Sequence, residues 1–185
     1  MADEGASPRE LILEASRRNN TSLLEETIAE LQAAAKKEGK KNPEEYVADV
    51  LNNATDGVGN GCLHVAATYG SYEILDLLLD QEGIQIDEVD RMEADTPLHK
   101  AVRYVNSLDK SEWEPVGHPI VDILLDAGCD PRIRNKAKLK PVELADPRNT
   151  ALRSMLQKGE FAMTAGGDVV EDDDNGPTGS ASDSE

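Results

Sequence analysis

Apolar residues recur at helical spacing along most of the chain. In residues 8–37 they form two runs at i, i+3 or i+4 and i+7, Leu11–Ala15 and Leu23–Leu31, separated by a polar turn. This pattern predicts two amphipathic helices. Farther along, Pro43 follows Asn42 and precedes two glutamates, which is typical of the first turn of a helix. We therefore expect two N-terminal helices and an extra short helix after them.

A segment of the chain then occurs twice. His64 and His99 stand 35 residues apart, each in a Leu-His-x-Ala string that is followed by an amphipathic helix ending near a glycine. A degraded third copy has Glu143 in the histidine position, 44 residues after His99. The longer spacing indicates an insertion at residues 107–117, which we expect to form a polar loop between two helices. A last helix is expected at 149–157.

Residues Thr96–Ala101 read Thr-Pro-Leu-His-Lys-Ala. Together with a repeat length of about 33 residues, this string is the signature of ankyrin repeats. Over residues 54–158 the sequence resembles an ankyrin-repeat protein. The resemblance implies an all-α solenoid of about four helix-pair units with short hairpin fingers. It divides the chain into capping helices with an extra short helix (1–53), repeats (54–86, 87–130 with the insertion 107–117, and a degenerate 131–158) and a disordered acidic tail (159–185).

The two histidines fit a structural function better than a catalytic one. Thr96 stands where a helix N-cap is expected and Pro97 at the first helical position. The resemblance implies that each histidine ring hydrogen-bonds the cap and an adjacent loop. No nucleophile or metal ligand lies at a fixed spacing from either ring, so the sequence predicts no catalytic residue, no metal site, no cofactor and no enzyme activity.

The charge balance narrows the class of partner. The chain has 19 basic and 37 acidic residues, which gives a net charge of −18. Such a protein repels nucleic acid and acidic membrane surfaces and attracts basic proteins. It has no apolar run long enough to span a membrane and begins without the apolar stretch of a signal peptide. Its two cysteines fit a reduced compartment, and we expect an intracellular protein that is monomeric when alone.

The last twenty residues contain seven acidic side chains and no basic one. Among them are Asp168, Glu171, Asp172, Asp173 and Asp174. A segment of this composition buries too little apolar surface to fold alone. Two functions remain open for it: a solubilising tail, or a mobile polyanion that captures a basic ligand.

A protein-binding surface is the remaining candidate site. The ankyrin resemblance implies a concave face built from finger tips and the exposed side of each first helix, with the candidate contact residues Val58, Asn60, Thr68, Tyr69, Arg91, Met92, Glu93, Asp95, Arg103, Tyr104 and Trp113. Trp113 lies in the insertion and is either an interface anchor or folded back onto helix ends. Five basic residues alternate over 132–140, so an extended strand would place all five on one face, facing acidic groups of this chain or of a partner.

Four segments (11–20, 62–70, 95–102 and 130–136) are similar to the small fungal ankyrin-repeat chaperones of a newly made KH-domain ribosomal protein of the small subunit. This resemblance implies a protein that keeps that basic ribosomal protein soluble until it joins pre-ribosomes, in the cytoplasm and the nucleus. Two alternatives stay open. One is an ankyrin adaptor or inhibitor of a kinase or proteasomal ATPase, and the other is an acidic histone-type chaperone.

Overall fold

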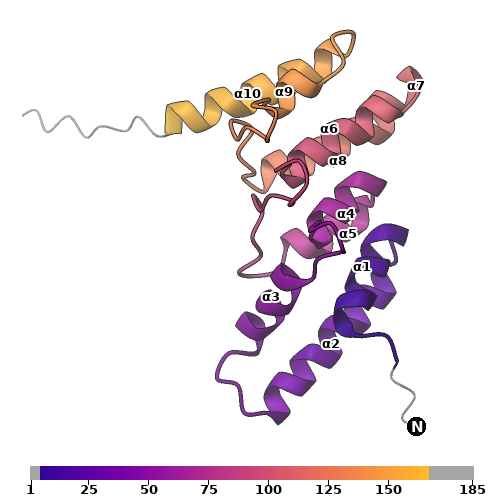
Figure 1. Ribbon diagram of the computed structural model, residues 1–185, viewed down its shortest axis with the longest axis vertical. Helices are drawn as coiled ribbons and strands as arrows, with labels where there is room; N and C mark the ends of the chain where they lie inside the picture. Colours follow the sequence, from indigo (N-terminus) through magenta and orange to yellow (C-terminus); the bar gives the residue numbers. More distant parts are fainter. Residues whose placement is uncertain (1–4, 167–185) are drawn as a thin grey trace, which may run out of the picture.

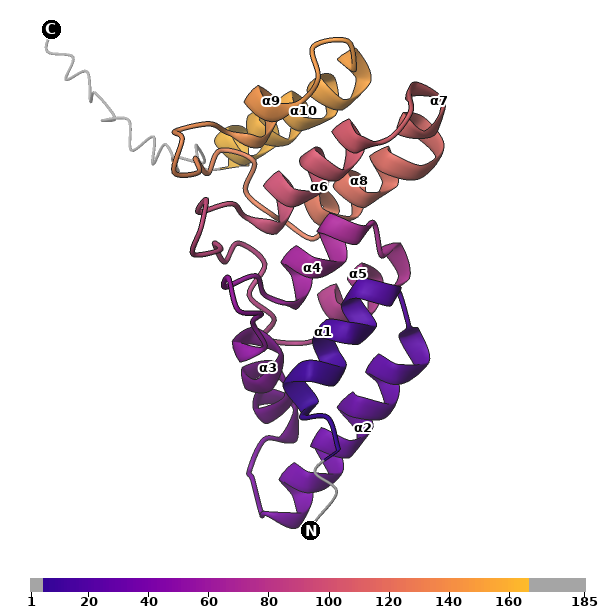
Figure 2. The same cartoon turned by 45° about the vertical axis from the view of Figure 1, so that its right-hand side comes forward.

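The computed structural model describes residues 5–166, which form a stack of helix pairs along one long axis (Figures 1 and 2). The pairs are α1 (Pro8–Arg18) with α2 (Thr21–Lys37), α4 (Cys62–Tyr69) with α5 (Tyr72–Leu79), α6 (Pro97–Ser107) with α8 (His118–Asp126), and α9 (Pro141–Leu144) with α10 (Thr150–Gly166). The extra helix α3 (Pro43–Asn53) packs against α1 and α2. No strand occurs in residues 5–166. The predicted all-α solenoid is confirmed.

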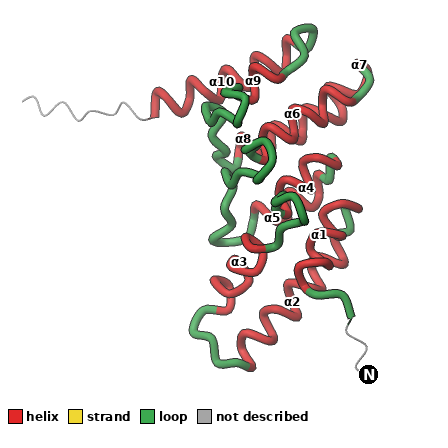
Figure 3. The backbone as a smooth tube through the Cα atoms, viewed as in Figure 1, coloured by secondary structure: helices red, strands yellow, loops and turns green. Residues whose placement is uncertain are grey.

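The stack has two layers of helices. The first helices of successive pairs, α1, α4, α6 and α9, pack side by side, and the second helices, α2, α5, α8 and α10, lie behind them. The loops that precede α4, α6 and α9 project on one side of the stack (Figure 3). We call residues 54–61, 84–96 and 129–140 fingers 1, 2 and 3, and we call the fingers with the exposed side of the first helices the finger surface.

Local sequence explains where the first helices begin. Thr96 caps α6, since its Oγ1 accepts a hydrogen bond from the His99 N–H at 3.4 Å, and Pro97 fills the first helical position. The terminal units use glutamate at the equivalent place. Glu10 Oε2 accepts from the Ser7 N–H at 2.8 Å, and Glu143 Oε2 accepts from the Lys140 N–H at 2.7 Å. The cap geometry is therefore the same in repeats with and without histidine.

One aliphatic core runs through the whole stack, as the low aromatic content requires. It contains fully buried side chains from every helix pair, among them Ile12, Leu24, Leu75, Leu98, Leu124 and Leu152. Burying such a side chain contributes about 1.5–3 kcal/mol. Because each pair contacts only its neighbours, this stability is built up one interface at a time.

The insertion differs from the predicted polar loop. Residues 110–117 are helical and form α7 (Lys110–Glu112) and a π-helical turn, η1 (Trp113–Gly117), that leads into α8. The Asp109 N–H donates to Glu112 Oε2 at 3.2 Å and so starts a helix within a polar stretch. Gly117 is buried, and a Cβ atom there would lie 3.0 Å from both γ-methyl groups of Val105. The turn is therefore pressed closely against α6.

The last helix is longer than the sequence predicted. It runs through Gly166, so residues 159–166 are helical where a disordered tail was expected to begin. An ion pair of 2.7 Å between Lys140 Nζ and Glu160 Oε2 ties this extension to finger 3. The acidic residues predicted to bind a partner, Asp168 and Glu171–Asp174, lie outside the described residues.

Finger 3 is a tight turn and not an extended strand, the conformation that would place its five basic residues on one face. The Asn135 N–H donates to the Leu139 carbonyl at 2.9 Å, and Lys138 adopts a positive φ of 67°. The basic residues therefore do not share one face. Arg132 pairs with Asp130 at 2.8 Å, and Arg134 pairs with Glu143 at 3.0 Å, so acidic groups of the same chain neutralise part of this cluster.

Candidate protein-binding surface

Each Leu-His string places its histidine ring between two repeats. In His64, Nδ1 accepts a hydrogen bond from the Gly61 N–H at 3.1 Å, and Nε2 lies 2.8 Å from the Asp95 carbonyl oxygen. His99 has the same arrangement. Its Nδ1 accepts a hydrogen bond from the Thr96 N–H at 3.1 Å, and its Nε2 lies 2.9 Å from the Leu139 carbonyl oxygen. Only a neutral ring protonated on Nε2 satisfies both contacts.

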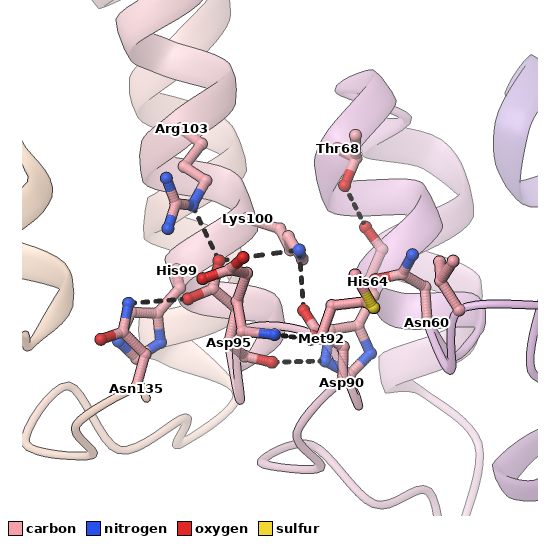
Figure 4. A network of polar contacts seen from close by, with 12 residues as sticks. Asn60, His64, Thr68, Asp90, Met92, Asp95, His99, Lys100, Arg103 and Asn135 are labelled. Carbon is pink, nitrogen blue, oxygen red and sulfur yellow. Dashed lines mark hydrogen bonds and ion pairs between the residues drawn. The ribbon is translucent and has the colours of Figure 1, made fainter. Parts of the chain in front are cut away.

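Burial lowers the pKa of both imidazoles, which keeps them neutral at neutral pH. Each ring thus joins the cap of its own helix to the finger of the following repeat, and Figure 4 shows this link for His64 and Asp95. Arg9 makes the corresponding link in the first unit, since its Nε donates to the Thr55 carbonyl at 2.6 Å. The fingers are held in place by the helices behind them.

A buried charged network fixes fingers 2 and 3 to each other. Asp95 is fully buried, and its Oδ2 accepts from Arg103 Nε at 2.7 Å while its Oδ1 accepts from Asn135 Nδ2 at 2.9 Å. Lys100 Nζ lies 2.7 Å from Asp90 Oδ2 and 3.6 Å from Asp95 Oδ2 (Figure 4). The carboxylates come from finger 2, the cations from α6 and the amide from finger 3.

Two opposing effects set the ionisation of the network. Burial acts to raise the pKa of Asp95, but hydrogen bonds from Arg103 and Asn135 outweigh it and hold the pKa below its ordinary value. Burial likewise opposes ionisation of Asp90, and Lys100 again overcomes it, so the pKa of Asp90 is lowered. Both carboxylates are ionised at neutral pH, and the network is complete.

Beside this framework, exposed apolar side chains lie on fingers 1 and 2 and at the C-terminal end of α4. Val58 on finger 1, Met92 on finger 2 and Tyr69 at the end of α4 are 46, 58 and 54% exposed. Adjacent fingers touch, since a Cβ atom on Gly59 would lie only 2.5 Å from Cγ of Arg91. The finger surface is therefore continuous from one repeat to the next and offers apolar contacts on a rigid base.

Comparison with known proteins agrees with this geometry. The family described as "Ankyrin repeats (3 copies)" matches residues 12–135. The chain belongs to the ankyrin-repeat family. It is 39% identical over 187 residues to the ankyrin repeat-containing protein YGL242C of Saccharomyces cerevisiae, and the match covers 96% of this chain and 95% of the yeast protein. It is also 35% identical over 108 residues to the NF-kappa-B inhibitor delta of Mus musculus, covering 58% of this chain and 26% of the mouse protein.

This ankyrin-repeat protein exposes most of the predicted contact residues on the finger surface. Those that are exposed are Val58, Thr68, Tyr69, Arg91, Met92, Glu93 and Arg103, and those that are half-buried are Asn60 and Tyr104. The Asn60 amide is bonded to Asp56, with Nδ2 3.0 Å from Oδ2. Tyr104 covers Gly70, where a Cβ atom would lie 2.1 Å from its Cζ.

Two of the predicted contact residues are placed elsewhere. Asp95 was predicted to face a partner, but it is buried because it is the acceptor at the centre of the ionic network. Trp113 is half-buried against the core, beside α7 at the helix ends that lie away from the fingers (Figure 1). Of the two interpretations of Trp113, the structure supports the one in which it folds back.

Sequence reasoning also missed members of the surface and its support. Val89 on finger 2 is 46% exposed, and Asp90, Lys100 and Asn135 complete the network. The position of apolar Val89 between two acidic residues could have indicated from sequence that its side chain is exposed. The hydrogen bond of Asn135 could not be predicted from sequence, because its partner Asp95 lies 40 residues earlier.

The described residues contain few groups suited to catalysis or metal binding. Within residues 5–166 no cluster of three or more His, Cys, Asp and Glu could hold a metal ion. Burial raises the pKa of the Cys62 and Cys129 thiols to about 12, so neither is a nucleophile. None of the described helices has the length and apolar character needed to cross a bilayer. Ankyrin repeats are typically non-catalytic protein–protein interaction modules, and the finger surface is the candidate site for such an interaction.

Proposed function

We propose that the finger surface of this protein binds a basic protein and that the chain is a non-enzymatic chaperone for a small-subunit ribosomal protein. The observation that carries the proposal is the exposure of Val58 and Met92 on the fingers and of Tyr69 at the end of α4, on a framework in which the buried network fixes fingers 2 and 3. Tyrosine and methionine are enriched at protein interfaces, and fingers that are already fixed lose little conformational entropy when they bind.

Charge supports a basic partner. At a net charge of −18 the chain attracts cationic proteins over a distance and repels nucleic acid. A ribosomal protein is basic because it binds RNA, and before assembly it needs its cationic and apolar surfaces covered. Such a chaperone acts in the cytoplasm and the nucleus, and it is monomeric until it binds its partner.

The mouse relative favours a second candidate. That protein is, by its name, an inhibitor of another protein. An adaptor or inhibitor of a kinase or proteasomal ATPase would use the same finger surface, and a histone-type chaperone would use mainly acidic groups. The three candidates differ in the identity of the bound protein.

Affinity capture followed by mass spectrometry distinguishes them. We expect the wild-type chain to retain a small-subunit ribosomal protein and the double variant Tyr69→Ser/Met92→Ser to lose it. Val116→Ser is the matched control, because Val116 is 41% exposed but lies in η1, at the helix ends away from the fingers. The purified ribosomal protein should then stay soluble only with wild type or the control. Capture of a kinase, an ATPase or histones in its place would contradict the ribosomal assignment.

A further inference from the structure

A groove runs along the other layer of the stack, between the second helices α8 and α10. Its main hollow has a volume of about 660 Å³ and is lined by Asp122, Leu125, Asp126, Met155, Gly159 and Ala162, among others. A hollow of about 230 Å³ adjoins it and shares Asp122, Asp126 and Met155, and one of about 220 Å³ shares Leu125, Gly159 and Ala162. Together they reach from Tyr72 on α5 to Met163 on α10.

Small residues of α10 create this groove. Ala151, Ser154, Gly159 and Ala162 line it, and they recur on one side of the helix. At Gly159 the helix approaches closely, since a Cβ atom there would lie 3.0 Å from Cδ2 of Leu125 and 3.4 Å from Cγ of Pro131. On either side of this contact, the short side chains leave space that the core does not fill.

The groove has an apolar floor and an acidic rim. Ile123, Leu125 and Met155 are half-buried and pack against the core. Glu114, Asp122 and Asp126 line the same hollows, are exposed, and have no ion-pair partner within residues 5–166. Lys158 also lines the groove, and His118 lies at its α5 end.

This rim contrasts with the finger surface. There Lys100 and Arg103 pair with Asp90 and Asp95 of finger 2, and the exposed Arg91 and Lys136 offset the exposed Glu88 and Glu93. The unpaired acids of the groove therefore give it a negative character that the fingers lack. An occupant that places apolar side chains on the floor and cations at the rim would neutralise these charges.

We propose that the groove between α8 and α10 is a second docking site, which takes a partner segment whose apolar side chains are flanked by Lys or Arg. This site is distinct from the finger surface and goes beyond the function proposed for it. A protein with both surfaces holds a partner at two places, or holds two partners at once, on opposite layers of the stack.

Fluorescence anisotropy with a labelled amphipathic peptide of leucine and lysine tests the proposal. Ala162→Trp, which fills the groove at an exposed position, should weaken peptide binding by about tenfold. The pair Asp122→Asn/Asp126→Asn should weaken binding several-fold and reduce its salt dependence, because it removes the rim charges. A peptide with glutamate in place of lysine should not bind.

Matched variants on α2 separate the groove from general effects. Ala29→Trp adds the same bulk, and Glu25→Gln/Glu26→Gln removes the same charge, at exposed positions of a helix at the far end of the stack. Both should bind the peptide as wild type does. Circular dichroism should show every variant folded, since all these positions are exposed.

Three outcomes would overturn the docking site. The first is wild-type affinity in Ala162→Trp, and the second is an equal loss in the α2 charge control, which would mean that only net charge matters. The third is loss of peptide binding in Tyr69→Ser/Met92→Ser with the groove variants unaffected, which would place the peptide on the fingers. Failure of the groove in these assays leaves capture of the ribosomal protein by the fingers untouched, so the two proposals fail separately.

Discussion

At the scale of single residues, the fold depends on His64 and His99 staying neutral. In the neutral ring, Nδ1 accepts a hydrogen bond from the backbone N–H of Gly61 or Thr96. A proton on Nδ1 would point at that N–H and break the hydrogen bond. Burial, which lowers the pKa of both rings, is therefore matched by a hydrogen-bonding pattern that only the neutral form completes.

This pattern predicts a stability loss in mild acid. The unfolded chain takes up protons on these histidines near the ordinary pKa of 6.5, while the folded chain does so only at lower pH. The histidine contribution is therefore complete above pH 6.5 and is lost as the pH falls below it. Chemical denaturation at a series of pH values should show the free energy of unfolding decreasing from pH 6.5 downward.

His64→Gln/His99→Gln should be less stable than wild type at neutral pH but should lose most of this slope. The control His118→Gln should keep it, because the pKa of neither buried ring is affected. An unchanged slope in the double variant would assign the acid sensitivity to other groups.

The function of these histidines could be predicted from sequence, because cap and ring lie within four consecutive residues, Gly61–His64 and Thr96–His99, and fit the ankyrin resemblance. The burial of Asp95 could not. It stands next to the cap like an exposed finger residue, and only the turn of finger 3 brings Asn135 to its carboxylate.

At the scale of elements, fingers 2 and 3 behave as one unit. Besides the bonds to Asp95, the Lys136 N–H donates to the Glu93 carbonyl at 2.7 Å, which joins the two backbones directly. Within finger 2, the Asp90 N–H donates a hydrogen bond to the Asp95 carbonyl oxygen at 3.0 Å. Order in one finger thus requires order in the other.

Asp95→Ala should therefore loosen a surface that Asp95 does not itself form. Removing the acceptor leaves Arg103 and Asn135 without their buried partner, and we expect a loss of about 3 kcal/mol in unfolding free energy. Hydrogen exchange should accelerate at the Lys136 amide, and partner binding should weaken. Glu14→Ala, which breaks only an exposed pair with Arg17 and Arg18, should cost less than about 1 kcal/mol. Unchanged exchange at Lys136 would contradict the coupling.

The periodic elements were predictable and the irregular ones were not. Helical spacing and caps located the pairs and the extra helix α3, because apolar period and N-cap residues are local properties. The insertion became helical because of an Asp109–Glu112 cap inside polar sequence, and α10 continued because Glu160 finds Lys140 in finger 3. The second case was decided by a contact between distant segments, and the first by a local cap in a stretch that has no apolar period.

At the scale of the whole molecule, charge and contact surface act on different steps of binding. The net charge of −18 acts over about 8 Å at physiological salt and so affects encounter. The exposed apolar side chains of Val58, Tyr69 and Met92 interact with a partner only after contact, and so they affect the dissociation rate.

Deleting residues 167–185, which carry seven of the acidic side chains, should slow association with the basic partner several-fold and flatten its salt dependence. The dissociation rate should change little, because the finger surface is intact. Stopped-flow kinetics over a salt series measures both rates. Equal association rates for the full and shortened chains at low salt would show that the tail only solubilises.

The first and last units of the stack carry glutamate at the position where the middle repeats carry histidine. His64 and His99 each reach forward to the next finger, whereas Glu143 bonds its own cap at Lys140 and the neighbouring Arg134. Glu10 likewise bonds its own cap at Ser7, and Arg9 supplies the link from the first unit to finger 1. A duplicated histidine repeat inserted before Lys140 would therefore keep the link from each unit to the next finger, whereas the same repeat added after Gly166 would follow a unit whose cap residue reaches no finger.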